Sequence, residues 1–302
     1  MDPLQCLGFG SLVGFISQNM SVRVRSLQLI ERKYILFTSK KENWVEISRT
    51  PGLSEEFIRE NSDKLYWGCI SQYQKLSEEF IKEFSDKLDW FCISSSQKLS
   101  EGFIKEFSDK LDWYNISIYQ KLSEEFIREF SDKVNWECIS IYQKLSEEFI
   151  RENLDKVKWG CISKYQKLSE EFIKEYNLEI SNTCWLYKDK EYKREYIKKN
   201  TEYEIIGDKV IAYKSCRSDG YSCYNFQYHY DVGKEYECHA DYNINDHNSF
   251  GLSAWTKEQA LDYNSTGKLF KVEIDLEDIA AIVHKGNKIR ASKIKILEEI
   301  SI

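Results

Sequence analysis

The sequence predicts an α-helical solenoid of 23-residue repeats, followed by a small α+β domain. The first observation behind this prediction is a set of apolar residues that recur at a constant step in the first part of the chain. The second is a change, beyond about residue 200, to short aromatic-rich segments in which apolar and polar residues alternate. A helical period in one part and a strand period in the other indicate two structural classes in one chain.

The repeat is defined first by its tryptophans, because six of the eight lie 23 residues apart. Leucine, phenylalanine and isoleucine recur with the same step, starting at Leu53, Phe57 and Ile47. Such self-similarity indicates a tandem array in which each unit buries its apolar face against its neighbours. The repeated tryptophans are Trp44, Trp67, Trp90, Trp113, Trp136 and Trp159.

The first part of each unit is expected to be a helix. In the unit that begins at Leu122, apolar residues lie at relative positions 0, 4, 5, 8 and 12, as far as Val134, which is a helical spacing. Ser123 is placed to cap the N-terminus of this helix, and Glu124 and Glu125 complement the positive end of its dipole.

The second part of the unit is expected to be another short helix. Ser131 and Asp132 offer a stop and a new cap, and the apolar residues Trp136, Ile139 and Tyr142 follow at steps of three. A leucine-rich repeat of similar length needs a Leu-x-Leu strand and an asparagine ladder, and the unit has neither. The spacing therefore predicts a pair of short helices in each unit.

Four of the nine cysteines occupy one register of the repeat. Neighbouring helices pack about 8–10 Å apart, whereas a disulfide needs Cα atoms within about 7 Å. We therefore expect these thiols to be small buried apolar groups and not bridges. They are Cys69, Cys92, Cys138 and Cys161.

The repeated segment closely resembles the tandem W-x-x-I-S-x-Y-Q-K-L-S-E-E-F-I repeat family of giant-virus proteins. Residues 136–150 read W-E-C-I-S-I-Y-Q-K-L-S-E-E-F-I, and the resemblance covers residues 44–176. It implies a viral origin, and it brings no biochemical activity, because members of that family mostly have none assigned.

The positions that vary among near-identical units are the candidate binding residues. The constant tryptophan, isoleucine, leucine and phenylalanine positions are expected to form the core, whereas a row of variable side chains is typical of a recognition surface. Neutral drift at exposed positions is the alternative explanation. The candidates are Gly68, Phe91, Tyr114 and Glu137 after the tryptophan, and Gln72, Ile118, Ile141 and Lys164 before the tyrosine position.

The period fails after Tyr176, and a different domain is expected to follow. The expected parts are a degenerate N-terminal cap at 1–43, the solenoid at 44–185, a linker helix at 186–200 and the α+β domain at 201–302. Alternating segments predict strands at 209–213, 226–230, 269–274 and 293–297. A capping box that starts at Thr256 predicts a short helix through Tyr263.

The last hundred residues resemble an uncharacterised domain family of phages and large viruses. The matching segments are Tyr213-Lys214, a Gly-Lys-x-Tyr turn at 233–236, a box at 251–255 and the Lys-Ile-x-Ile-Leu strand at 293–297. Ser253 stands where that family usually has histidine, and Trp255 where it has cysteine. If the box carries chemistry in the family, its loss here argues against activity.

The same domain also resembles, in the order of its segments, the ADP-ribosyltransferases. That resemblance implies that Lys214 holds the cofactor phosphates, Ser253 braces the nicotinamide ribose and Glu273 stabilises the oxocarbenium charge. Those enzymes usually carry arginine or histidine on the first strand, and Glu273 also fits an exposed position of an alternating strand.

A metal site is the remaining chemical hypothesis for this domain. The candidate ligands are Cys216, Cys223, Cys238 and His239, which lie close together in the sequence. Zinc sites usually show two pairs of closely spaced ligands, and only Cys238-His239 forms such a pair. We therefore predict no metal and no cofactor.

Composition limits the partners. With 43 basic and 50 acidic residues the net charge is -7, which does not favour nucleic acid. No apolar run is long enough for a membrane span, and the start Met1-Asp2-Pro3 lacks the basic region of a secretory signal, so we expect a cytoplasmic protein. The location is then the cytosol of an infected host cell, with the virion as the alternative.

The favoured function is binding of a host or viral protein by the solenoid surface. One alternative is an enzyme, an ADP-ribosyltransferase-like or other transferase, in the C-terminal domain with the solenoid as its targeting arm. A second alternative is a structural role in particle assembly.

Overall fold

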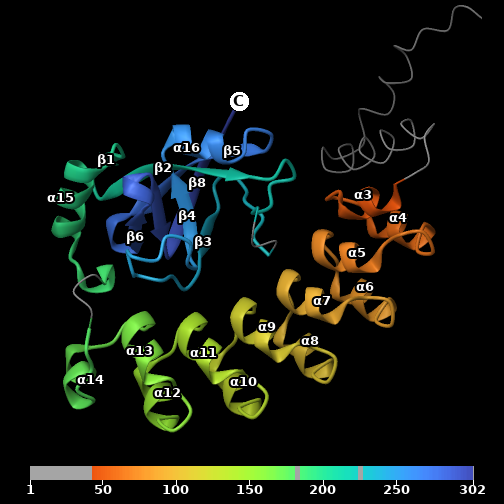
Figure 1. Cartoon of the computed structure of the whole chain (residues 1–302), viewed down its shortest axis with the longest axis horizontal. Helices are drawn as coiled ribbons and strands as arrows, with labels where there is room; N and C mark the ends of the chain where they lie inside the picture. Colours follow the sequence, from red (N-terminus) through yellow and green to blue (C-terminus); the bar gives the residue numbers. More distant parts are fainter. Residues whose placement is uncertain (1–42, 181–183, 224–226, 302) are drawn as a thin grey trace, which may run out of the picture. The chain divides into compact units, whose positions relative to one another are not determined.

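The computed structural model describes residues 43–180, 184–223 and 227–301 (Figure 1). The chain divides into two compact units, residues 1–88 and 89–302. Helices α3 to α6 belong to the first unit, and helices α7 to α14 and a sheet domain belong to the second. The expected N-terminal cap at 1–43 lies, except for Asn43, outside the described residues.

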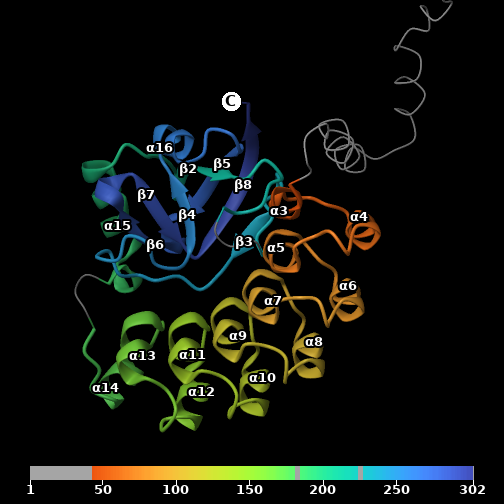
Figure 2. The same cartoon turned by 45° about the vertical axis from the view of Figure 1, so that its right-hand side comes forward.

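Two kinds of short helix alternate along residues 44–175, so the expected tandem array of helix pairs is confirmed. The tryptophan helices start at the repeated tryptophan: α3 (Trp44–Arg49), α5 (Trp67–Tyr73), α7 (Trp90–Ser96), α9 (Trp113–Tyr119), α11 (Trp136–Tyr142) and α13 (Trp159–Tyr165). The glutamate helices start one residue after the repeated serine: α4 (Glu55–Glu60), α6 (Glu78–Glu83), α8 (Glu101–Glu106), α10 (Glu124–Glu129), α12 (Glu147–Glu152) and α14 (Glu170–Glu175). Within the second unit, α7, α9, α11 and α13 form one row and α8, α10 and α12 another (Figure 2).

The glutamate helices start as expected but end early. Ser123 Oγ accepts a hydrogen bond from the Phe126 backbone N–H at 3.2 Å, which caps α10. The helix ends at Glu129, before the stop expected at Ser131 and Asp132, although the apolar spacing continues to Val134. The Val134 N–H donates to the Phe130 carbonyl at 3.0 Å in the turn that follows, and Val134 is buried there. A tight turn thus gives Val134 the core position that the helical spacing suggested.

The cap of the tryptophan helix also differs from the prediction. Asn135 Oδ1 accepts from the Cys138 N–H at 2.9 Å and caps α11, whereas Ser131 and Asp132 lie too early to do so. The Ser131 carbonyl instead accepts from the Trp136 indole Nε1–H at 2.8 Å. The turn residues therefore fix the tryptophan ring.

A ladder of buried glutamines connects successive repeats. Gln143 Oε1 accepts from the Leu122 N–H at 3.1 Å. Gln143 Nε2 donates to the carbonyls of Ser117 and Gln120, both at 2.9 Å. In residues 1–88, Gln74 binds four backbone groups of the preceding repeat in the same way. The array lacks the asparagine ladder of leucine-rich repeats, but these glutamines satisfy buried backbone groups in a comparable manner.

Serine and glutamate side chains add further links between repeats. Ser140 Oγ donates to the Trp136 carbonyl at 2.7 Å and accepts from the Lys158 N–H at 3.0 Å. Glu124 Oε1 accepts from the Ser146 N–H at 2.7 Å, so the first glutamate of the helix orders the cap of the next glutamate helix. Polar groups thus set the register of the array, and the apolar residues fill it.

The sheet domain contains eight strands among the described residues, and all of their pairings are antiparallel. Their order is β3-β8-β5-β2-β4-β7-β6, and β1 pairs with β2 beside that path. The strands are β1 (Glu204–Ile206), β2 (Lys209–Cys216), β3 (Glu235–Glu237), β4 (Leu252–Trp255), β5 (Lys268–Asp275), β6 (Ile279–Val283), β7 (Lys288–Ala291) and β8 (Lys293–Ile300). The helices are α15 (Lys190–Asn200), α16 (Lys257–Tyr263) and the short turns η1 (Trp185–Tyr187), η2 (Leu276–Asp278) and η3 (His284–Gly286).

Three of the four predicted strands are confirmed, as β2, β5 and β8, and the predicted helix is α16. The prediction at 226–230 is wrong for its described part, where residues 227–230 form only a single bridge between Tyr221 and His229. The capping box at Thr256 is also wrong, because its side chain makes no capping hydrogen bond. Strands β1, β3, β4, β6 and β7 were not predicted. Most of them are too short to show an alternating pattern, and they form through pairing with neighbouring strands.

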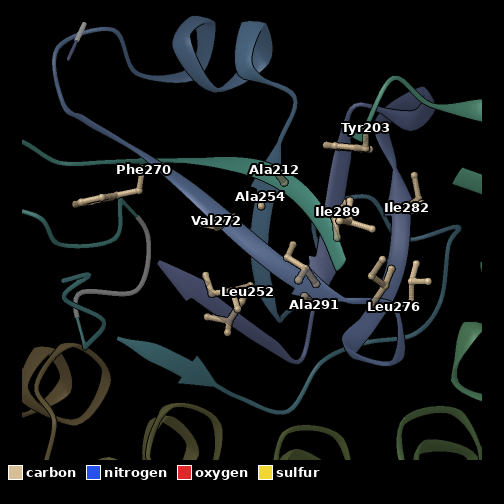
Figure 3. Packing of buried hydrophobic residues seen from close by; sticks show 14 of the residues in the cluster. Tyr203, Ala212, Leu252, Ala254, Phe270, Val272, Leu276, Ile282, Ile289 and Ala291 are labelled. Carbon is tan, nitrogen blue, oxygen red and sulfur yellow. The ribbon is translucent and has the colours of Figure 1, made fainter. Parts of the chain in front are cut away.

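The core of the sheet domain lies on one face of the central strands (Figure 3). Ala212 on β2, Ala254 on β4 and Val272 on β5 are fully buried there. Helix α15, in the segment expected to be a linker, contributes Ile197 to this core. Lys193 of α15 is also buried, and its Nζ donates to the Ile279 carbonyl at 2.7 Å. Helix α15 is therefore packed as part of the sheet domain.

In the part of the chain that the structure describes, no helix combines the length and the apolar character that crossing a bilayer requires.

Candidate binding face of the repeat array

The residue after each repeated tryptophan is exposed to solvent. Gly68, Phe91, Tyr114 and Glu137 all occupy the second position of their helix and all are exposed. The exposed fraction is 62% for Phe91 and 57% for Tyr114, which is high for large apolar side chains. In the second unit, Phe91 and Tyr114 lie on the neighbouring helices α7 and α9 (Figure 2).

The second set of candidates lies one helical turn further along. Gln72, Ile118, Ile141 and Lys164 occupy the sixth position of their helices. Residues four apart share one face of a helix, so each belongs to the same face as the residue after its tryptophan. Gln72, Ile118 and Ile141 are half-buried and Lys164 is exposed. Lys164 Nζ lies 4.6 Å from the centre of the Tyr165 ring, and its contact with Tyr165 raises the pKa of the ammonium group.

The tryptophan rings fix the helices that carry this face. The Trp113 ring stacks on Phe130 with centroids 5.1 Å apart, and its Nε1–H donates to the Ser108 carbonyl at 2.8 Å. Lys133 Nζ lies 5.8 Å from the centre of the same ring. The indole is therefore held by a stacked ring, a hydrogen bond and a cation, and its helix has a defined orientation.

The cysteines of the repeat lie beside the candidate face. Cys69, Cys92, Cys138 and Cys161 lie at the third position of their helices. Only Cys138 is buried, so the expected burial is wrong for the other three, which are half-buried. Burial raises the pKa of Cys138 to about 11, so its thiol is protonated at neutral pH. A protonated buried thiol is a poor nucleophile and a poor metal ligand, which fits a packing role.

The transferase candidates of the sheet domain are not brought together. Lys214 is buried, donates from Nζ to the Ser253 carbonyl at 2.8 Å and lies 4.6 Å from the centre of the Tyr230 ring. Glu273 is directly opposite Ile211, and Phe270 is directly opposite Lys214. Directly paired residues share a face and alternate residues change face, so Lys214 and Glu273 project from opposite sides of the sheet. They do not line one pocket.

The charges and ion-pair partners of Lys214 and Glu273 also differ from those expected of a catalytic pair. Burial lowers the pKa of Lys214, which disfavours its charged form. Glu273 lies 3.6 Å from Lys295 Nζ and 3.8 Å from Lys209 Nζ, on the other face. Its carboxylate is therefore compensated by two lysines of the surface.

The candidate metal ligands lie in different surroundings: Cys216 is buried, whereas Cys223, Cys238 and His239 are half-buried. Burial raises the pKa of both Cys216 and Cys238 to about 12, and the Asn264 Nδ2 donates to Cys223 Sγ at 3.6 Å. His239 stacks on Phe250, with ring centres 5.6 Å apart. Among the residues that the structure describes, no three His, Cys, Asp or Glu side chains are grouped to hold a metal ion.

The sequence analysis missed two aromatic residues as candidates, one in the repeat array and one in the sheet domain. Tyr119, at the end of α9, is 41% exposed. Phe250, which precedes β4, lies against Tyr142 with ring centres 4.8 Å apart. The signal for the first was the recurrence of tyrosine at the last position of the tryptophan helices, and the sequence held no signal for the second.

Neither a scan against protein-family models nor searches of the curated proteins and of the solved structures find a match to this chain.

Proposed function

We propose that this chain is a viral repeat protein whose helices form a solenoid that binds a host or viral protein. The binding surface is the face of the tryptophan helices that carries Phe91 and Tyr114. The exposure of these two large side chains at equivalent positions of neighbouring helices is the observation that supports this proposal most directly. The proposed site of action is the cytosol of the infected cell.

The packing of the array supports a role for this face in recognition. The links between repeats come from buried glutamines, serines and glutamates, and none of these bonds uses the side chain of Phe91 or Tyr114. The Tyr114 side chain does hydrogen-bond to Cys138 of the next repeat, so the folding of the Tyr114 variant is checked beside its binding. Exposed aromatic residues on a rigid support are typical of the residues that dominate protein interfaces, because they bury a large area at low entropic cost.

The test is capture of a partner by the full chain and by a double variant, Phe91→Ser with Tyr114→Ser. Tagged protein is incubated with lysate of infected host cells, and bound proteins are quantified by mass spectrometry. We expect the double variant to retain at least about tenfold less of the specific partner. The matched control is Tyr192→Ser, because Tyr192 is 46% exposed on α15. Equal capture by the double variant, or equal loss in the control, refutes this binding face.

A further inference from the structure

The tryptophan helices α9, α11 and α13 end in tyrosines, and one pair of these tyrosines holds an aromatic side chain of the same chain. Tyr119, Tyr142 and Tyr165 follow one another at the repeat spacing of 23 residues. Phe250 lies against two of them, with ring centres 4.8 Å from Tyr142 and 5.7 Å from Tyr165. Both contacts are tilted, which is a favourable geometry for aromatic pairs. We call the space between the last tyrosines of neighbouring tryptophan helices a tyrosine notch.

Phe250 is presented to its notch by a fixed piece of backbone. Its carbonyl accepts from the Asp241 N–H at 3.1 Å. Gly251 follows with φ of +134°, and a Cβ there would lie 2.6 Å from Arg290 Cγ, so only glycine fits. Arg290 is fully buried, and its Nη1 lies 3.3 Å from Asp241 Oδ2. The aromatic ring is thus preorganised, which lowers the entropic cost of its contact with the array.

The same residue type recurs at the ends of the neighbouring helices α9 and α11, as Tyr119 and Tyr142. The notch between these two tyrosines shares Tyr142 with the notch that holds Phe250. Tyr119 is 41% exposed. Tyr142 and Tyr165, which contact Phe250, are less exposed and are half-buried. The exposed ring of Tyr114 lies on the same helix α9, and Phe91 lies on α7.

We propose that the notch between Tyr119 and Tyr142 binds an aromatic side chain of a partner peptide, as the neighbouring notch binds Phe250. The occupant is a phenylalanine or tyrosine followed by a small residue, in the manner of Phe250-Gly251. The inference rests on the proposed function and adds to it the chemistry of the partner. Positions that repeat the same residue type favour the same ligand chemistry, so the intramolecular occupant indicates what the notch between Tyr119 and Tyr142 accepts.

The test uses a peptide of this chain, residues 246–254, as the probe. Its binding to the full chain is measured by titration calorimetry and by NMR of the labelled peptide, beside a control peptide with Phe250→Ala. We expect one peptide per chain for the native probe and at least about fivefold weaker binding for the control peptide. Binding that does not depend on the phenylalanine overturns the proposal.

Variants of the chain locate the site. Tyr119→Ala is expected to weaken binding about fivefold or more, while Tyr119→Phe retains it because the ring remains. Tyr263→Ala, which removes another partly exposed tyrosine in the sheet domain, is the matched control and keeps native binding. The Phe250→Ala chain opens the second notch and is expected to bind two peptides. One peptide on that variant, or full binding by Tyr119→Ala, overturns the assignment.

The two proposals fail separately. If the peptide does not bind while partner capture still depends on Phe91 and Tyr114, the notch is wrong and the binding face stands. If the peptide binds at Tyr119 while capture is indifferent to Phe91 and Tyr114, the notch stands and the partner does not use that face.

Discussion

Replacing one rung of the glutamine ladder tests the structural argument most sharply. Gln143→Leu preserves the volume of the side chain but removes one acceptor and two donors. The Leu122 N–H and the carbonyls of Ser117 and Gln120 then lose hydrogen bonds of 3.1, 2.9 and 2.9 Å. Gln143 is 5% exposed, so little water reaches the site to replace these bonds.

The magnitude follows from the number of bonds. At about 1 to 1.5 kcal/mol of net stability each, three bonds contribute about 3 to 4.5 kcal/mol to the free energy of unfolding. The backbone groups left buried without partners raise the cost further, and the apolar gain of leucine offsets part of it. We therefore expect Gln143→Leu to lower the free energy of unfolding by about 3 kcal/mol.

The assay is urea unfolding followed by far-UV circular dichroism, with the slope of the transition checked for a change in cooperativity. The matched control is Lys121→Leu, because Lys121 directly follows the ladder residue Gln120 and is exposed. The control should change stability by no more than about 0.5 kcal/mol. If Gln143→Leu unfolds at the same urea concentration as the native chain, the ladder does not hold the repeats together.

Three further predictions concern a ring, a histidine and two thiols. Trp113→Ala should cost about 2 kcal/mol of stability in the same urea assay, because its half-buried ring stacks on neighbouring phenylalanines; an unchanged transition would place the ring in solvent. Burial lowers the pKa of His239 to about 4, below the ordinary 6.5, so only the unfolded or undocked imidazole gains a proton between those values. The free energy of unfolding should therefore fall by about 2 kcal/mol from pH 7 to pH 5. In the His239→Gln variant, this contribution to the pH dependence should be absent. Cys216 and Cys238, whose pKa values are raised to about 12, should resist iodoacetamide in the native protein and react in urea, as read by mass spectrometry; fast native labelling would contradict these raised pKa values.

The sequence alone determined the repeat, because a helical array depends on contacts between residues close in the chain. The spacing of Trp113 and its equivalents required a unit that packs on its own copies, and the cap at Ser123 followed from local backbone chemistry. The strands at 209–213, 269–274 and 293–297 were readable for the same reason, since alternation is local. The short helix lengths were not readable, because the turn at Phe130 places Val134 in the core without helical geometry.

Only the tertiary structure decided which distant residues meet. The order of the sheet places Lys214 and Glu273 on opposite faces, although both lie on predicted strands. Phe250 reaches Tyr142 and Tyr165 from a segment that carries no repeat signal. Periodicity states which face of an element is apolar, whereas strand order and loop placement depend on packing between segments far apart in the chain. The helical repeats could therefore be predicted from the sequence, whereas the contacts of Phe250 with Tyr142 and Tyr165 could be identified only in the folded chain.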